Sequence, residues 1–353
     1  MNKLLMKGNE ALGEAAIRAG CRYFFGYPIT PQTELPQYLS KRMPEIGGVF
    51  LQAESEVAAI NMVYGASGAG ARVMTSSSSP GISLKAEGIS YIVGAELPCV
   101  IVNVMRGGPG LGGIQPSQGD YFQATKGGGH GDYKLLVLAP ASVQETVDLT
   151  ILAFNLADKY RNPVMILSDG IIGQMMEPVE FKQTDDNELP VKDWATTGKK
   201  GRKKNIINSL FLQPEKLEQH VNRLADKFRE MKAKEQRAEI YLTEDAEILL
   251  AAYGTSARVC KKAIDMAREE GIKVGLFRPI SLWPFPVVLL QKQLSGIKGI
   301  LTVEMSLGQM VEDVRLAVNG KVPVDFYGRT GGMVPTPRAI FEKIIAFREV
   351  YRL

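Results

Sequence analysis

Apolar runs that predict buried strands alternate with helix-like segments along the first half of the chain. The helix-like segments carry small and apolar residues at helical spacing, and Asn9 is predicted to cap the first helix while Gly20 ends it. Continuous apolar strands separated by helices are typical of a parallel sheet covered on both faces. This part of the chain therefore predicts an open α/β layer structure. The predicted strands are 21–27, 47–53, 71–78, 97–106, 133–140 and 163–169, and the predicted helices are 9–20, a short helix after Pro31, 55–70, 79–96 and 142–160.

The pattern changes to charged and polar residues between positions 181 and 240. This stretch contains the basic run "GKKGRKKN" and a polar helix that starts at Pro214, and it predicts a connector. Strand, helix and strand patterns return from Ala246 onward. We therefore expect three parts: a first domain over 1–180, a charged connector over 181–240 and a second, smaller α/β domain over 241–353.

Composition narrows the class of protein without naming a function. The chain has 353 residues, of which 45% are hydrophobic, enough for two domains with full cores. Its apolar runs fall short of the ~20 residues that a membrane helix needs, so a cytoplasmic protein is expected. Forty-two basic residues stand against 38 acidic ones, a balance that argues against a nucleic-acid protein. Cys21, Cys99 and Cys260 are far apart in the sequence, so they predict neither a disulfide framework nor a metal or cluster motif.

Three short motifs resemble known sites, and each has a plainer interpretation. "SSSSPG" lacks the first glycine of a hydrolase nucleophile turn, and Ser79 with Pro80 instead predicts the start of a helix. "GPGLGG" (108–113) formally matches a dinucleotide-binding loop, but its prolines leave no helix opening from it, which favours a simple loop. "SDG" (168–170) lacks the leading glycine of a thiamine diphosphate magnesium motif, so it is interpreted as a strand end.

The charged side chains leave several interpretations open. Glu54 and Glu56 lie where a buried strand meets a helix, and an acid there can offset the helix dipole or point into a cleft at the carboxyl edge of the sheet. His130 and Asp132, in "GGGHGD", could line such a cleft or shape a loop. His220 is predicted to have no specific role. The basic run is interpreted as a solvated linker, with a role in holding an acidic carrier or a phosphate as the alternative.

Six motifs, taken together, carry a resemblance to a known family. "YPITP", "LQAESEVAA", "VMTSSSSPG", "NVMRGGPG", "ATKGGGHGD" and "RNPVMILSDG" occur in the order and spacing of the 2-oxoacid:ferredoxin oxidoreductases. The chain resembles their α-type subunit, in particular the branched-chain (2-ketoisovalerate) form, with the 2-oxoglutarate form as the alternative. The resemblance implies a pyrimidine-binding domain of thiamine diphosphate enzymes, followed by a domain like the C-terminal domain of transketolase.

The resemblance also implies a divided active site and a set of partners. It implies that Glu56 is the catalytic carboxylate that binds the cofactor's pyrimidine ring, with Tyr27 and Pro28 as further cofactor contacts. It assigns the substrate carboxylate to Thr30 and Arg106, with Thr30 at a helix N-terminus. The diphosphate and Mg²⁺ are expected in a β-type subunit, and 4Fe–4S clusters in partner subunits. The other expected partners are a γ-type subunit and a ferredoxin-like subunit. Coenzyme A is an expected substrate and ferredoxin the expected electron acceptor.

Two rival hypotheses stay open at the level of sequence. A self-contained nucleotide-binding dehydrogenase rests on "GPGLGG" and predicts that the isolated chain binds a dinucleotide. A noncatalytic scaffold subunit predicts that replacing Glu56 leaves turnover unchanged.

Overall fold

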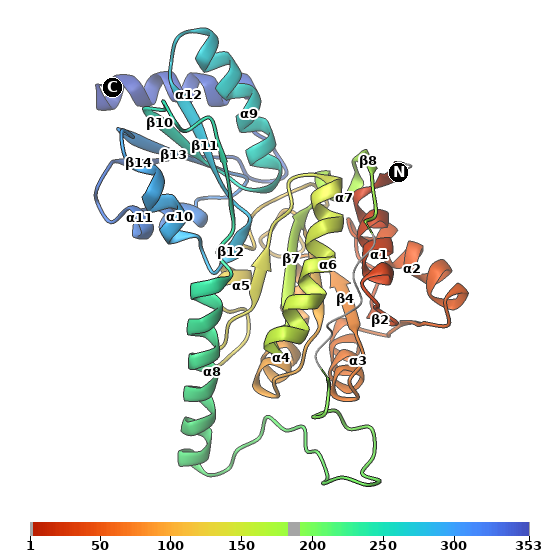
Figure 1. The fold of residues 1–353 in the computed structure, drawn as a ribbon. Helices are drawn as coiled ribbons and strands as arrows, with labels where there is room; N and C mark the ends of the chain where they lie inside the picture. Colours follow the sequence, from red (N-terminus) through yellow and green to blue (C-terminus); the bar gives the residue numbers. More distant parts are fainter. Residues whose placement is uncertain (1–2, 183–190, 353) are drawn as a thin grey trace.

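The computed structural model describes residues 3–182 and 191–352, which form two α/β domains (Figure 1). The larger sheet has the strand order β12-β6-β7-β5-β4-β2-β3. Six of its strands are parallel, and β12 pairs antiparallel with β6 at one edge. Their bounds are β2 Tyr23–Gly26, β3 Val49–Gln52, β4 Val73–Ser77, β5 Val100–Met105, β6 Leu136–Leu138, β7 Val164–Asp169 and β12 Ser281–Trp283.

Helices cover both faces of this sheet because successive side chains of each strand point to opposite faces. In β5, for example, Val100, Val102 and Val104 pack on one face, and Ile101 with Met105 packs on the other. The first face is covered by α1 Gly8–Arg18, α2 Glu34–Glu45 and α6 Val143–Tyr160, and the second by α3 Glu56–Gly68 and α4 Pro80–Gly94.

The second domain is a five-stranded sheet in the order β14-β13-β10-β11-β9, parallel except for β9. Its strands are β9 Ala238–Tyr241, β10 Ile248–Ala251, β11 Val274–Pro279, β13 Gly299–Glu304 and β14 Val324–Gly328. Its helices are α9 Gly254–Glu269, α10 Val287–Gln293, α11 Met310–Val318 and α12 Pro337–Tyr351.

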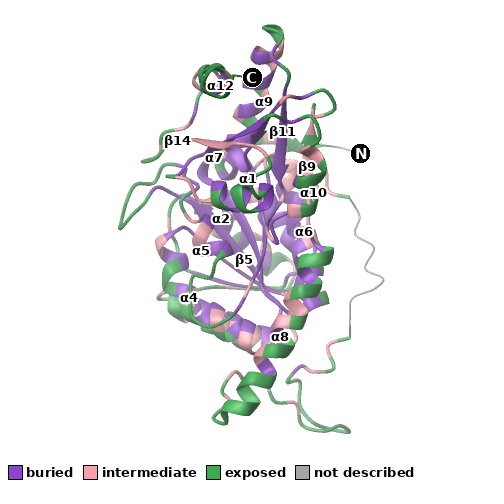
Figure 2. Ribbon diagram, turned by 90° about the vertical axis from the view of Figure 1, so that its left-hand side faces the viewer, coloured by how far each residue is buried: buried purple, intermediate pink, exposed green. Residues whose placement is uncertain are grey.

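The remaining elements are short or peripheral, except for one long helix. Residues 191–213 contain no helix or strand, and α8 Pro214–Lys234 then runs along one side of the molecule with its outer surface exposed (Figure 2). No helix in the described part of the chain is long and apolar enough to cross a membrane. The other elements are the antiparallel pair β1 Leu4–Lys7 and β8 Met176–Val179, and the short helices α5 Tyr121–Thr125 and α7 Gly170–Gln174.

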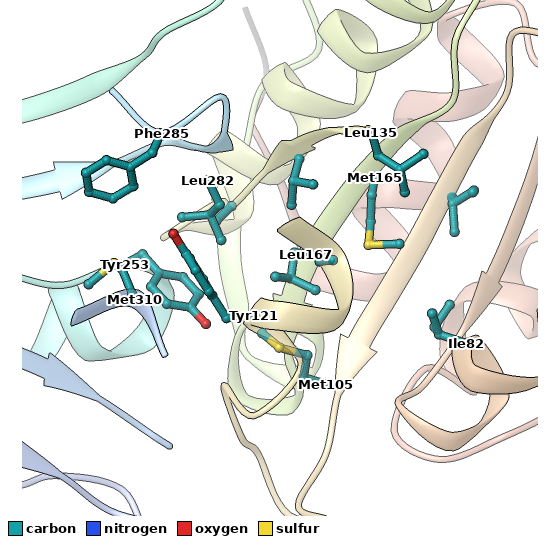
Figure 3. Packing of buried hydrophobic residues seen from close by; sticks show 14 of the residues in the cluster. Ile82, Met105, Tyr121, Leu135, Met165, Leu167, Tyr253, Leu282, Phe285 and Met310 are labelled. Carbon is teal, nitrogen blue, oxygen red and sulfur yellow. The ribbon is translucent and has the colours of Figure 1, made fainter. Parts of the chain in front are cut away.

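One hydrophobic core runs through both domains. Tyr121, from α5, lies against Tyr253 with ring centroids 5.9 Å apart, and the Tyr121 hydroxyl donates to Asp313 Oδ2 at 2.6 Å. Leu282 and Phe285 belong to the same cluster (Figure 3). The second domain is therefore packed against the first rather than loosely tethered to it.

The structure confirms the predicted α/β class and corrects three local predictions. α1 begins at Gly8, so Asn9 is no cap. It lies inside the first turn, where its side-chain amide donates to the Pro31 carbonyl at 3.0 Å. Thr30 does not begin a helix, because α2 starts only at Glu34.

His220, predicted to have no specific role, is buried and hydrogen-bonded at both ring nitrogens. The predicted loop at 108–113 is confirmed, since no helix opens from it, whereas the domain limits themselves stay a prediction.

Candidate active site

The polar residues of the candidate site lie at the carboxyl edge of the larger sheet. Thr30 follows β2, Glu56 follows β3, Ser77 ends β4 and Arg106 follows β5. Because these strands are parallel and adjacent, their carboxyl ends lie along a single edge. Ligands of open α/β sheets bind at this edge, so the topology alone brings these residues into one region.

Glu56 is a buried carboxylate at the start of a helix. It is the first residue of α3, and Ser55 caps that helix by accepting a hydrogen bond from the Ala58 N–H at 3.2 Å. The Glu56 side chain is only 6% exposed, and its carboxylate makes no hydrogen bond with the described residues. The side chain is buried but its oxygens form no internal hydrogen bond within the described ranges, so they are available to a ligand. Glu54, two residues earlier, is exposed.

Gly81 leaves the space into which the Glu56 carboxylate fits. A Cβ atom on Gly81 would lie 2.7 Å from Glu56 Oε1 and 2.0 Å from Ser77 Oγ. Ser77 Oγ and Ser78 Oγ are buried and have no hydrogen-bond partner in the described part of the chain. In Figure 1, α3, α4 and β4 lie side by side, and these side chains come from that group of elements and the turn after β4. The carboxylate and the two hydroxyls thus form a small polar group that has no hydrogen-bond partner within residues 3–182 and 191–352.

A lysine missed by the sequence analysis lies one helical turn further along α4. Lys85 is fully buried, and its Nζ donates to Thr75 Oγ1 at 2.7 Å and to the Ser76 carbonyl at 2.9 Å. Burial lowers the pKa of Lys85 to about 7, and the charge of Glu56 opposes that change. The helical spacing offered a signal, because Lys85 lies four residues after Gly81 and four before the buried Ile89.

Arg106 is buried between two loops. Its guanidinium donates to the Thr30 carbonyl at 3.1 Å and to the Leu111 carbonyl at 3.0 Å, and its Nε–H is buried without a partner among the described residues. The structure thus brings Arg106 and Thr30 together, as the sequence predicted. The Thr30 side chain is exposed, and its hydroxyl makes no hydrogen bond to the residues described.

A hydrogen-bonded group fixes the backbone from which Arg106 projects. Ser79 Oγ accepts from the Arg106 N–H at 3.0 Å and lies 2.6 Å from Asp120 Oδ2, to which it donates. Asn103 donates to the same Asp120 oxygen at 2.9 Å and accepts from the Ser79 N–H at 3.0 Å. Ser79 has φ of 28°, a strained value for a residue with a side chain, which these bonds hold in place. Burial raises the pKa of Asp120, and its bonds to Ser79 and Asn103 oppose that rise.

The other predicted residues lie outside this group. Tyr27 and Pro28 are exposed at the end of β2 and line a cavity of about 190 Å³ with residues of α2 and β3. His130 and Asp132 line a different cavity, of about 560 Å³, between α4 and α8. Asp169, in "SDG", ends β7 and caps α7, and it also accepts from Thr255 Oγ1 at 2.8 Å. That motif therefore joins the two domains.

Comparisons with known proteins show the family to which the chain belongs. Residues 14–243 match the family model described as pyruvate flavodoxin/ferredoxin oxidoreductase, thiamine diphosphate-binding, and residues 246–340 match pyruvate:ferredoxin oxidoreductase core domain II. The chain is 52% identical to the ketoisovalerate oxidoreductase subunit VorB of Methanothermobacter thermautotrophicus, over 96% of each chain. It is 37% identical to the 2-oxoglutarate synthase subunit KorA of the same organism, over 96% of this chain and 97% of the relative.

Solved structures extend the comparison to the fold. The 2-oxoglutarate:ferredoxin oxidoreductase from Magnetococcus marinus, with 2-oxoglutarate, coenzyme A and succinyl-CoA bound, matches with a TM-score of 0.87 and 29% identity. The match covers 98% of this chain and 65% of that one. A split-gene transketolase shares the fold at a TM-score of 0.57 and 16% identity. The chain therefore belongs to the pyruvate flavodoxin/ferredoxin oxidoreductase family and is similar along nearly its whole length to a ketoisovalerate oxidoreductase subunit.

Proposed function

We propose that this chain is the pyrimidine-binding subunit of a thiamine diphosphate-dependent 2-oxoacid:ferredoxin oxidoreductase that acts on branched-chain 2-oxoacids such as 2-ketoisovalerate. With coenzyme A, the assembled enzyme converts the 2-oxoacid to acyl-CoA and carbon dioxide, releases one proton and passes two electrons to ferredoxin. The similarity to VorB subunits favours the branched-chain substrate over 2-oxoglutarate, the substrate named for the more distant KorA relatives.

The observation that carries this proposal is the buried, unpartnered carboxylate of Glu56 at the carboxyl edge of the sheet. A ring nitrogen that bears a proton fits such a carboxylate, and a charge-assisted hydrogen bond is strong in a site without water. The space beside Gly81 and the free hydroxyls of Ser77 and Ser78 suit a polar aromatic ring. That Tyr27 and Pro28 add contacts to the cofactor stays a prediction.

Thiamine diphosphate, when bound, would supply a carbon nucleophile at its thiazolium C2 and, in its own amino group, the base for that carbon. Glu56 would accept a hydrogen bond from the pyrimidine ring nitrogen and so hold a proton at that atom. A proton held there would make the neighbouring amino group a better base.

Arg106 and Thr30 are proposed to bind the carboxylate of the 2-oxoacid. The guanidinium is held by two backbone carbonyls, and its Nε–H and the Thr30 hydroxyl are without partners within the described ranges. A planar guanidinium suits a carboxylate, because its donors are fixed in a fork that matches the two oxygens.

Partner subunits are proposed to complete the site and carry the electrons. Within the described residues, no three His, Cys, Asp or Glu side chains are grouped so that they could hold a metal ion. We assign Mg²⁺ and the diphosphate to a β-type subunit. The iron–sulfur clusters are assigned to the ferredoxin-like partner and its neighbours.

Glu56→Gln in the assembled complex tests the proposal. The amide cannot stabilise the protonated ring nitrogen as a carboxylate does, so the exchange of the thiazolium C2 proton with solvent should slow by about 10²- to 10⁴-fold. Assembly, followed by gel filtration, should be unchanged. Glu54→Gln is the matched control: the same change on an exposed neighbour should leave the exchange rate at the parent value.

Two outcomes would favour the rival functions. Unchanged C2 exchange and turnover in Glu56→Gln would favour a noncatalytic scaffold. Micromolar binding of NAD(P)H to the isolated chain in titration calorimetry would favour a nucleotide-binding dehydrogenase. A panel of 2-oxoacids with a viologen acceptor decides between branched-chain substrates and 2-oxoglutarate.

A further inference from the structure

Lys85 is a charged residue enclosed by the protein beside the candidate cofactor site. The exposed fraction of its side chain is zero. Among the described residues, no other lysine is buried. Two neutral oxygens, Thr75 Oγ1 and the Ser76 carbonyl, hold its Nζ at the end of β4.

The position of Lys85 relative to Glu56 is unusual for two opposite charges. Both side chains are buried, and Glu56 Oε1 lies beside Gly81, which is one helical turn before Lys85 on α4. Yet no ion pair within 4.0 Å joins them among the described residues. The Glu56 oxygens therefore remain free for a ligand, while the ammonium stays near enough to act through space.

Stability does not explain this arrangement. Removing an ammonium from water is costly, and the two bonds to Thr75 and Ser76 replace only part of its hydration. A neutral side chain of similar volume, such as methionine, would fill most of the same space without that cost. Charges that are costly to bury and lie beside a catalytic group are typical of functional sites.

We propose that Lys85 is a positioning residue that polarises Glu56, so that the proton shared by Glu56 and the cofactor's pyrimidine nitrogen rests on the nitrogen. This inference depends on the proposed role of Glu56. Because Lys85 is enclosed, a ligand that enters from the sheet edge meets the carboxylate and not the ammonium. Coulomb attraction weakens with distance, so an ammonium close to the carboxylate would stabilise the negative charge there more than it would oppose a positive charge on the ring beyond it.

The charges that face Lys85 are few, so its titration is simple to interpret. From α3, Glu56 is the charged group that acts on it. From β4 come the neutral Thr75 and Ser76. On α4 itself, Glu87 is exposed and bonded to the Tyr91 hydroxyl. With the pKa of Lys85 lowered to about 7, its charge is present below that pH and lost above it.

The test compares the parent complex with Lys85→Met between pH 6 and pH 9. At pH 6 we expect C2 proton exchange to be about tenfold slower in Lys85→Met, a part of the loss expected for Glu56→Gln. The difference should fade above pH 8, because Lys85 of the parent is then neutral. Calorimetric binding of thiamine diphosphate gives a second measurement: the parent should bind more weakly above pH 7, and Lys85→Met should lack that pH dependence.

Two further variants separate the charge from the hydrogen bonds. Lys85→Gln keeps a hydrogen-bond donor without the charge and should behave like Lys85→Met. It can therefore replace Lys85→Met in the test if the methionine variant does not assemble. Thr75→Val removes one hydrogen bond but keeps the amine, so the pH-dependent difference from Lys85→Met should persist and be displaced to lower pH, because the ammonium loses one acceptor.

The possible results are distinguishable. Equal exchange rates in the parent and the neutral variants at every pH would overturn the inference. A constant ratio at every pH would do the same, because it would indicate a purely structural role. If Glu56→Gln itself exchanges at the parent rate, the proposed function fails, and the inference about Lys85 fails with it.

Discussion

At the scale of single residues, the candidate site depends on a glycine as much as on its charged groups. Gly81→Ala would place a Cβ atom 2.7 Å from Glu56 Oε1 and 2.0 Å from Ser77 Oγ, so one of these side chains must move. We expect at least a tenfold loss of C2 proton exchange, because a small displacement of a catalytic group is costly.

Gly65→Ala is the control for this change. Gly65 lies inside α3, is exposed, and a Cβ atom there would meet nothing within 4 Å. Alanine favours the helix by about 0.5–1 kcal/mol relative to glycine, so this variant should be active and slightly more stable. Full activity of Gly81→Ala would show that Glu56 is not held in its place by this contact.

The sequence predicted where Glu56 and Arg106 lie in the fold, but it did not predict the local structure at Thr30. Glu56 and Arg106 lie in short motifs directly after strands, and the strand order places them at one edge of the sheet. Thr30 was wrongly placed at a helix start because Pro31 resembles a first helical residue, whereas α2 begins three residues later. Lys85 was missed because lysine is nearly always exposed, and only its spacing from Gly81 shows that it lies on the buried face.

At the scale of elements, one histidine attaches the long helix α8 to the first domain. His220 Nε2 lies 2.7 Å from the Gly94 carbonyl at the end of α4, so this nitrogen carries the hydrogen. Its Nδ1 then accepts from Arg223 at 2.7 Å, and the ring stacks on Phe211 with centroids 4.7 Å apart. The helix is otherwise polar, and few of its residues are buried.

His220→Ala should therefore loosen α8 locally. Loss of the ring removes the hydrogen bond to the partly buried Gly94 carbonyl, at a cost of about 0.5–1.5 kcal/mol. Hydrogen exchange of the α8 amides should become faster, while exchange in β5 stays slow. Gln219→Ala changes the exposed neighbour and should leave α8 protected. Unchanged protection in His220→Ala would mean that other contacts hold the helix.

The short strands that the sequence analysis missed form only by pairing with strands that are distant in the sequence. β12 is a three-residue strand that leaves the second domain and pairs with β6, more than 140 positions earlier. β1 likewise pairs with β8. Local patterns predict a strand when its own residues alternate or form an apolar run, but a short edge strand depends on a partner that the pattern does not contain.

At the scale of the whole molecule, buried polar contacts join the two domains. Arg278 of β11 bonds to both oxygens of Glu145, at 2.9 and 2.7 Å, and to Glu239 at 2.5 Å. Asp169 and Thr255 form a second link, at 2.8 Å. These contacts flank the shared hydrophobic core, so the position of the second domain is fixed at several points.

Gln118 connects the loop after β5 to the second domain through three side-chain hydrogen bonds. Its side chain is fully buried, donates to the Tyr253 carbonyl at 2.9 Å, and accepts from the Ser256 hydroxyl at 2.7 Å and the Met305 N–H at 2.9 Å. The same loop, after β5, includes Leu111, whose carbonyl holds Arg106. The second domain thus anchors the segment that positions the proposed substrate-binding arginine.

Gln118→Met tests this connection, since it conserves volume while removing all three side-chain hydrogen bonds. We expect a loss of about 2–4 kcal/mol of stability, because buried groups of Tyr253 and Met305 lose their partners. The KM for the 2-oxoacid should rise, because Arg106 is less well held, while C2 proton exchange, which depends on Glu56, stays near the parent rate. Gln115→Met makes the same change at an exposed position of the loop and should alter neither quantity. If Gln118→Met unfolds at the parent's temperature with an unchanged KM, the loop is held by its other contacts, and the second domain has no part in placing Arg106.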